Sequence, residues 1–64
     1  MIRIHRTKYG EYNFDPETRV VSYTNSRNDN LKRWKIVDGE AKLIEKIGPG
    51  SKRLPKRVFE NIPD

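Results

Sequence analysis

The sequence predicts a mostly β protein, a single small antiparallel five-stranded meander or partly open barrel that ends in a short C-terminal helix. Near the N-terminus apolar and polar residues alternate, as in a half-buried strand. Two turn signals, Asp15-Pro16 and Asp38-Gly39, each lie between runs that favour β-structure. Helical spacing of apolar residues is clearest after Pro55.

Length and composition predict one domain, residues 1–64, with a thin core. Only 33% of the 64 residues are hydrophobic, and a chain this short buries little surface. The chain has no Cys, which predicts a reducing, cytoplasmic setting and no disulfide. No run approaches the ~18 apolar residues of a membrane span. The start at Met1 fits a complete small protein, a class frequent among phage and mobile elements.

The first predicted strand is residues 2–6, IRIHR. Alternation turns Ile2 and Ile4 inward and leaves Arg3 and His5 in solvent.

Residues 9–24 predict a β-hairpin. Its flanks are rich in Tyr, Phe, Val and Thr, and residues 15–18 suit a type I turn in which Pro16 presets φ. With those four residues as the loop, Phe14 pairs with Arg19 and Tyr12 pairs with Val21. Gly10 then pairs with Tyr23, and the apolar and aromatic members share one face.

The fragment GEYNFDPETRVV resembles the first hairpin of the small sheet domains by which tyrosine recombinases hold arm-type DNA sites. The resemblance covers residues 10–21, and Arg19 stands where that pattern usually has Gly. It assigns no functional residue in this chain.

Residues 24–30, TNSRNDN, predict a polar loop. It is interpreted as a plain connector. The alternative is a binding loop that contacts phosphates through Asn25, Arg27 and Asn28.

Residues 31–47, LKRWKIVDGEAKLIEKI, have two interpretations. In the first, Asp38-Gly39 forms a type I′ hairpin turn. Outward pairing then sets Ile36 against Ala41, Trp34 against Leu43 and Lys32 against Glu45. The opposite face of this hairpin carries four cations: Arg33, Lys35, Lys42 and Lys46.

In the second interpretation, residues 39–47 form a helix that Asp38 caps and that Gly48 and Pro49 end. This alternative gives an α+β fold, with a three- to four-stranded antiparallel sheet backed by that helix. The four cations then no longer share a face.

The C-terminal part predicts a short helix at residues 55–61. Pro55 suits the first turn, and Val58, Phe59 and Ile62 recur at helical spacing. A second basic cluster lies at its start: Lys52, Arg53, Lys56 and Arg57.

No residue pattern predicts catalysis, a metal site or a cofactor. His5 is the only His, and it has no acidic or Cys neighbour in sequence. The carboxylates and serines lack the partners that acid–base or nucleophilic chemistry requires. We therefore expect a protein that is not an enzyme and that uses no cofactor.

The charge predicts a nucleic-acid-binding protein, with DNA preferred to RNA as the partner. The net charge is +5, and the pI is near 9.8, above the value of about 9 typical of such domains. Most aromatic residues are needed for the core, and Tyr9 is the best candidate for an exposed ring. The expected phosphate contacts are Arg33, Lys35, Lys42, Lys46, Lys52, Arg53, Lys56 and Arg57.

The alternative function is a small protein-binding inhibitor or adaptor, of phage origin, that docks on an acidic host protein. A nucleic-acid binder should gather its cations on one face, whereas an inhibitor should show an apolar patch with a charged rim. Neither function involves a membrane.

Overall fold

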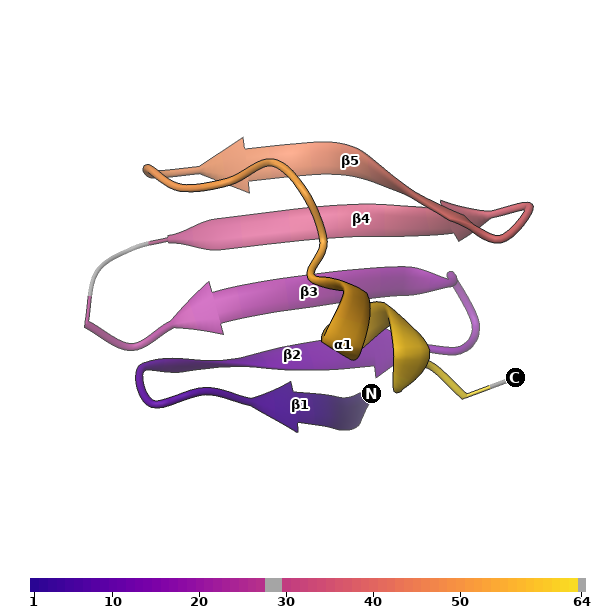
Figure 1. Cartoon of the computed structure of the whole chain (residues 1–64), viewed down its shortest axis with the longest axis horizontal. Helices are drawn as coiled ribbons and strands as arrows, with labels where there is room; N and C mark the ends of the chain where they lie inside the picture. The colour runs from indigo at the N-terminus through magenta and orange to yellow at the C-terminus, as the bar shows by residue number, and fades with distance from the viewer. Residues whose placement is uncertain (28–29, 64) are drawn as a thin grey trace.

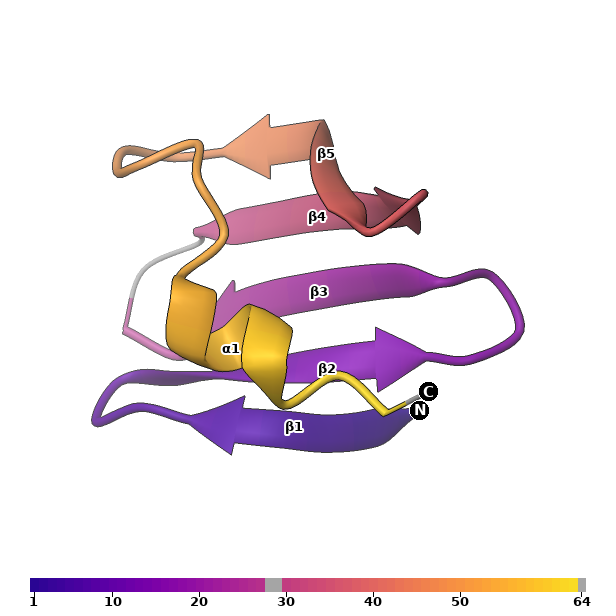
Figure 2. The same cartoon turned by 45° about the vertical axis from the view of Figure 1, so that its right-hand side comes forward.

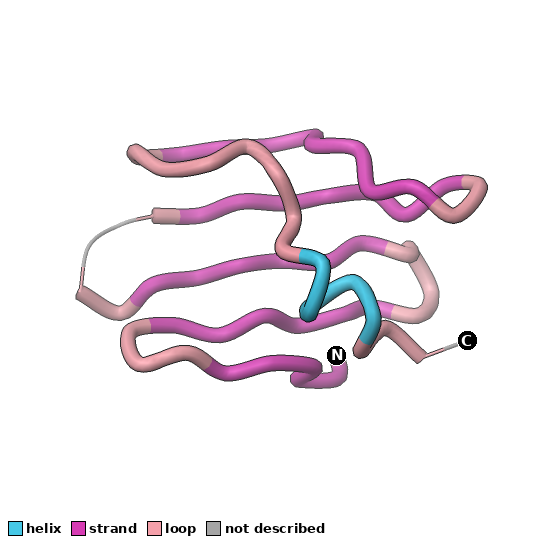
Figure 3. The backbone as a smooth tube through the Cα atoms, in the orientation of Figure 1, coloured by secondary structure: helices cyan, strands magenta, loops and turns pink. Residues whose placement is uncertain are grey.

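The computed structural model, which describes residues 1–27 and 30–63, is one open sheet of five antiparallel strands in the order β1-β2-β3-β4-β5. A short helix, α1, lies across one face of it (Figures 1 and 3). The elements are β1 Ile2–Arg6, β2 Gly10–Asp15, β3 Val20–Asn25, β4 Leu31–Val37, β5 Glu40–Ile47 and α1 Lys56–Glu60. The predicted meander is confirmed, and it is an open sheet.

The alternative helix at residues 39–47 is wrong, because residues 40–47 form β5. Asp38 (φ 52°) and Gly39 (φ 76°) both have positive φ, as a type I′ turn requires. The helix-forming residues that follow pair with β4, where Ala41 and Leu43 pack against the core. Tertiary packing here outweighs local propensity.

The predicted register of the first hairpin is wrong by two residues. Phe14 pairs with Val21 and Tyr12 with Tyr23, so the loop is residues 16–19. A shift of two keeps every side chain on its predicted face. Gly10 now pairs with Asn25, yet the Tyr23 ring still covers it, since a Cβ on Gly10 would lie 3.0 Å from that ring.

The core lies between the sheet and the C-terminal segment. Its buried members are Phe14, Val21, Trp34, Ile36, Leu54 and Val58. The predicted core aromatics are all there or packed against it, including Tyr12, Tyr23 and Phe59. Here the face that carries α1 is called the helix side, and the opposite, uncovered face is called the open face.

Strand β1 differs from its prediction because a bulge lies between Arg3 and His5. Ile4 packs against the core, while Ile2 is 46% exposed. The bulge sets His5 opposite Tyr12, with ring centroids 6.0 Å apart, so His5 is not on the face predicted for it.

The C-terminal segment crosses the strands rather than running along them. From the end of β5 it passes in front of β5 and β4, and α1 then lies over β3 and β2 in both views (Figures 1 and 2). Asn61 continues this path to the first strand, since its Nδ2 donates to the Ile4 carbonyl at 3.1 Å. No helix in the described part of the chain is long and apolar enough to cross a membrane.

Candidate nucleic-acid interface

The open face holds three of the predicted contact residues: Arg33, Lys35 and Lys42. Lys35 pairs with Lys42 across β4 and β5, as predicted. Arg33 forms an ion pair with Glu45 at 3.2 Å, and Lys35 Nζ donates to the Thr18 carbonyl. Two of these three cations therefore already have partners within the fold.

Acidic residues also lie on the open face. Glu11 and Asp15 alternate along β2 with the core residues Tyr12 and Phe14, so they point away from α1. Arg3 and Arg6 of β1 pair with Asn13 and Glu11 and lie on this face too, so three carboxylates, Glu45 included, offset part of the charge of five cations. The open face is thus not the strongly basic surface that the hairpin pattern predicts.

Lys46 lies on the helix side instead, because β5 contains a bulge. Trp34 pairs with Leu43 but Arg33 pairs with Glu45, which leaves Ile44 as the extra residue. Beyond the bulge Lys46 pairs with Lys32, so the predicted pair of Lys32 with Glu45 is wrong.

Lys32 points to the helix side with Lys46. On β4, Lys32 is two residues from the buried Trp34, and its Nζ lies 5.6 Å from the Tyr23 ring centroid. Lys46 Nζ donates to the Gly48 carbonyl at 2.7 Å. Gly48 begins the C-terminal segment that crosses the strands, residues 48–62, which is called the crossing segment below. The sequence did not predict Lys32 as a phosphate contact, because its pairing with Lys46 depends on the bulge.

The whole net charge of the protein resides in residues 46–59. This segment contains five cations and no acidic residue. Removing those five from the 14 Lys and Arg leaves nine, which match the nine Asp and Glu of the remaining chain. We call the five cations the basic strip: Lys46, Lys52, Arg53, Lys56 and Arg57.

The crossing segment holds the last four cations of the basic strip outward. Trp34 Nε1 donates to the Lys52 carbonyl at 3.1 Å, and Leu54 and Val58 are buried against the sheet. Because these three contacts anchor the backbone, the neighbouring charged side chains are left exposed: Lys52, Arg53, Lys56 and Arg57.

Three of these cations line a shallow groove of about 430 Å³ with apolar walls. Lys52, Arg53 and Lys56 border it together with Leu54, Phe59 and residues 39–41 at the start of β5. Glu40 is the acidic residue that lines it. A concave surface with several cations above apolar atoms suits an anionic ligand.

The residues predicted for the polar loop have structural partners. Asn25 Nδ2 donates to the Tyr23 hydroxyl at 2.9 Å, and Asn25 Oδ1 accepts from the Arg27 amide at 2.9 Å. The Arg27 guanidinium lies over the Tyr9 ring, with Cζ 4.7 Å from its centroid. Asn28 lies outside the described residues.

In the described residues no group of three His, Cys, Asp or Glu is placed to hold a metal ion. Burial raises the pKa of the Tyr12 hydroxyl, and the neighbouring Tyr23 raises it further. Tyr12 therefore stays neutral and adds no negative charge to the helix side.

The basic strip lies on the helix side, where the backbone of the crossing segment positions four of its five cations. Comparison with protein-family models, with curated proteins and with solved structures finds no match to this chain.

Proposed function

We propose that this protein binds nucleic acid through the basic strip and Lys32 on the helix side. The observation that supports the proposal is the confinement of the +5 net charge to one segment that is anchored across one face of the sheet. Cations gathered in this way neutralise successive phosphates and release their counterions, which drives association. The function proposed is binding without catalysis.

The proposal revises the contact set that the sequence predicts. Lys46, Lys52, Arg53, Lys56 and Arg57 remain as the phosphate contacts, and Lys32 joins them. Arg33, Lys35 and Lys42 have a lesser part, since they lie on the other face beside acidic residues.

Salt dependence gives the proposal a quantitative form. Six phosphate contacts predict that log K falls against log salt with a slope of about −4.2 on single strands and about −5.4 on duplex DNA. Fluorescence anisotropy of labelled oligonucleotides at several salt concentrations measures this slope.

Two triple variants compare the contributions of the two faces to binding, and each variant lowers the net charge by the same amount. The helix-side variant is Lys52→Gln, Arg53→Gln and Lys56→Gln, and the open-face variant is Arg33→Gln, Lys35→Gln and Lys42→Gln. Each removes two Lys and one Arg. We expect the helix-side variant to lose at least about tenfold in affinity and to flatten the slope by about 2 to 3, while the open-face variant changes little.

The outcomes decide the proposal directly. Absence of salt-dependent binding by the wild type at ~50 mM salt would overturn it. An equal loss in both triple variants would show that net charge acts without a defined face. Circular dichroism of each variant confirms that the sheet remains.

One observation favours the alternative, a protein-binding inhibitor or adaptor. Met1 is 82% exposed and Ile44 is 57% exposed, and both border a hollow of about 310 Å³ on the open face that Val20 and Arg33 also line. An apolar patch beside a cation suits an acidic protein partner. This function requires a partner that the Ile44→Glu variant fails to bind and that the helix-side triple variant still binds.

A further inference from the structure

Tyr9 lies at the tip of a tightly closed turn between β1 and β2. The Thr7 amide donates to the Gly10 carbonyl at 2.8 Å, and the Gly10 amide donates to Thr7 Oγ1 at 3.0 Å. The Thr7 hydroxyl also donates to the Gly10 carbonyl at 3.1 Å. These bonds fix the positions from which Lys8 and Tyr9 project.

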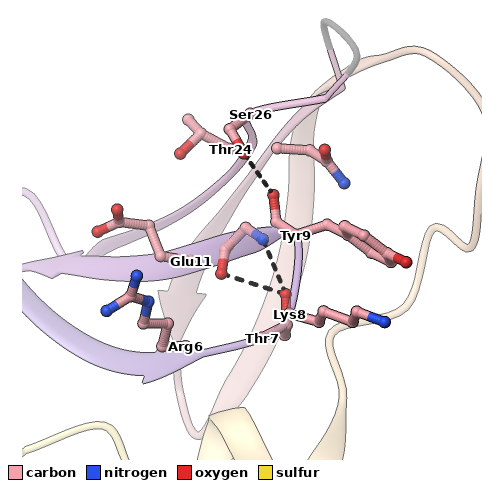
Figure 4. Close-up of a pocket in the computed structure, with 9 residues that line it drawn as sticks. Arg6, Thr7, Lys8, Tyr9, Glu11, Thr24 and Ser26 are labelled. Carbon is pink, nitrogen blue, oxygen red and sulfur yellow. Dashed lines mark hydrogen bonds between the residues drawn. The ribbon is translucent and has the colours of Figure 1, made fainter.

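A second set of bonds fixes Tyr9 from the neighbouring hairpin. Its carbonyl accepts from the Ser26 amide at 3.0 Å and from the Ser26 hydroxyl at 3.1 Å (Figure 4). The backbone of Tyr9 is therefore held from two directions, although its side chain is 40% exposed.

Among the described residues Tyr9 is the one aromatic side chain outside the core. The other five are buried in the core or packed against it. A ring that is 40% exposed contributes less to the stability of the core than a buried ring does. Singly exposed apolar residues are common, and the surroundings of Tyr9 are what distinguish it.

Two cations flank the Tyr9 ring. Lys8 Nζ lies 5.4 Å from the ring centroid and Arg27 Cζ lies 4.7 Å from it. Figure 4 shows Lys8 and Tyr9 extending to one side of the strands, and Arg6 and Glu11 extending to the other. Glu11, the acidic residue among those that line the hollow at this turn, therefore points away from the ring.

A continuous path joins Tyr9 to the basic strip along the helix side. The Tyr23 ring covers Gly10, next to Tyr9, and Lys32 Nζ lies over that same Tyr23 ring. Lys32 pairs with Lys46, the first member of the basic strip. Three strand spacings separate β2 from β5, about 15 Å, which a few nucleotides can span.

We propose that Tyr9 is a stacking site for an unpaired nucleobase, with Lys8 and Arg27 beside it for the flanking phosphates. This inference rests on the proposed function and makes it more specific, since it identifies single-stranded nucleic acid as the ligand. Bases in a duplex are already stacked and paired, and their faces are closed to a side chain. A stacking tyrosine therefore adds affinity only for single strands.

The test compares Tyr9→Leu with Tyr9→Trp on single-stranded and duplex oligonucleotides of equal length. Leu keeps an apolar side chain but removes the ring. We expect it to weaken single-strand binding about tenfold and to leave duplex binding unchanged. Tyr9→Trp should retain single-strand affinity, and its added fluorescence should be quenched by single strands and not by duplex.

The two proposals fail in different ways. Wild-type affinity of Tyr9→Leu for single strands, with salt-dependent binding intact, would overturn the stacking site and leave the proposed function standing. Equal losses on single strands and duplex would likewise overturn it, because stacking predicts a difference. Absence of all oligonucleotide binding by the wild type would overturn both. Thermal unfolding of Tyr9→Leu checks that the fold is kept.

Discussion

Arg19 has a backbone conformation with positive φ, which residues other than glycine rarely adopt. Its φ is 61°, and its amide donates to the Asp15 carbonyl at 2.8 Å to close the turn between β2 and β3. Asp15 Oδ1 accepts from the Glu17 amide at 2.9 Å, so the turn begins as its sequence predicts. Arg19 joins the four-residue loop and Asp15 joins β2, so the loop lies one residue later than predicted and the pairing is displaced by two.

This conformation gives a prediction at the residue scale. We expect Arg19→Gly to be more stable than Arg19→Ala by about 1 kcal/mol, because only Gly adopts positive φ without strain. Both variants lose the contact of the guanidinium with Phe14, where Cζ lies 5.3 Å from the ring centroid, so that loss cancels in the comparison. Urea unfolding followed by Trp34 fluorescence measures the difference. Equal stabilities would show that the turn relaxes to another conformation.

The faces of individual side chains were predictable wherever strict alternation holds. Phe14, Val21 and Trp34 are buried, as the period of two requires. Lys46 and His5 were not predictable, because each follows a bulge that shifts the alternation by one residue. Local sequence carries no clear signal for an extra residue in a strand.

At the scale of elements, the bulge in β5 changes which charged groups meet. A regular strand would set Glu45 opposite Lys32 on the helix side. With Ile44 as the extra residue, Glu45 reaches Arg33 on the open face and Lys46 joins Lys32. The bulge thus removes a negative charge from the helix side and adds a positive one.

The sequence predicted the turn at Asp38-Gly39 and the approximate ends of the strands. It did not decide whether residues 40–47 form a strand or a helix. Those residues suit a short helix by propensity. The decision comes from distant contacts: β4 has an edge to pair, and Ala41 and Leu43 pack against the core. The C-terminal helix was predicted at residues 55–61, and α1 spans Lys56–Glu60.

The crossing segment should contribute to stability as well as to binding. Leu54 is buried at 8% exposure, so we expect Leu54→Ala to cost about 2 to 3 kcal/mol by leaving a cavity between the segment and the sheet. The neighbouring Lys56→Ala, which removes an exposed side chain, should change stability by less than about 0.5 kcal/mol. Thermal and urea unfolding compare the two. Equal effects would mean that the segment is not packed in solution.

At the scale of the whole molecule, one segment both closes the core and carries the net charge. A 64-residue domain has little stability to spare. The cations at residues 52–57 repel one another on the surface that completes the core. Binding of an anionic ligand should reduce this repulsion. Because such a ligand binds only the native state, it should also raise the free energy of unfolding by mass action.

Nucleic acid bound on the helix side, as proposed, and nucleic acid bound on the open face would shift the signals of different arginine side chains. Nuclear magnetic resonance resolves the Nε–Hε group of each Arg during titration with a single-stranded oligonucleotide. The structure predicts that Arg53 and Arg57 shift strongly, with Arg27 following, while Arg33 in its ion pair with Glu45 stays in place. A large shift of Arg33 with Arg53 and Arg57 unmoved would contradict the account.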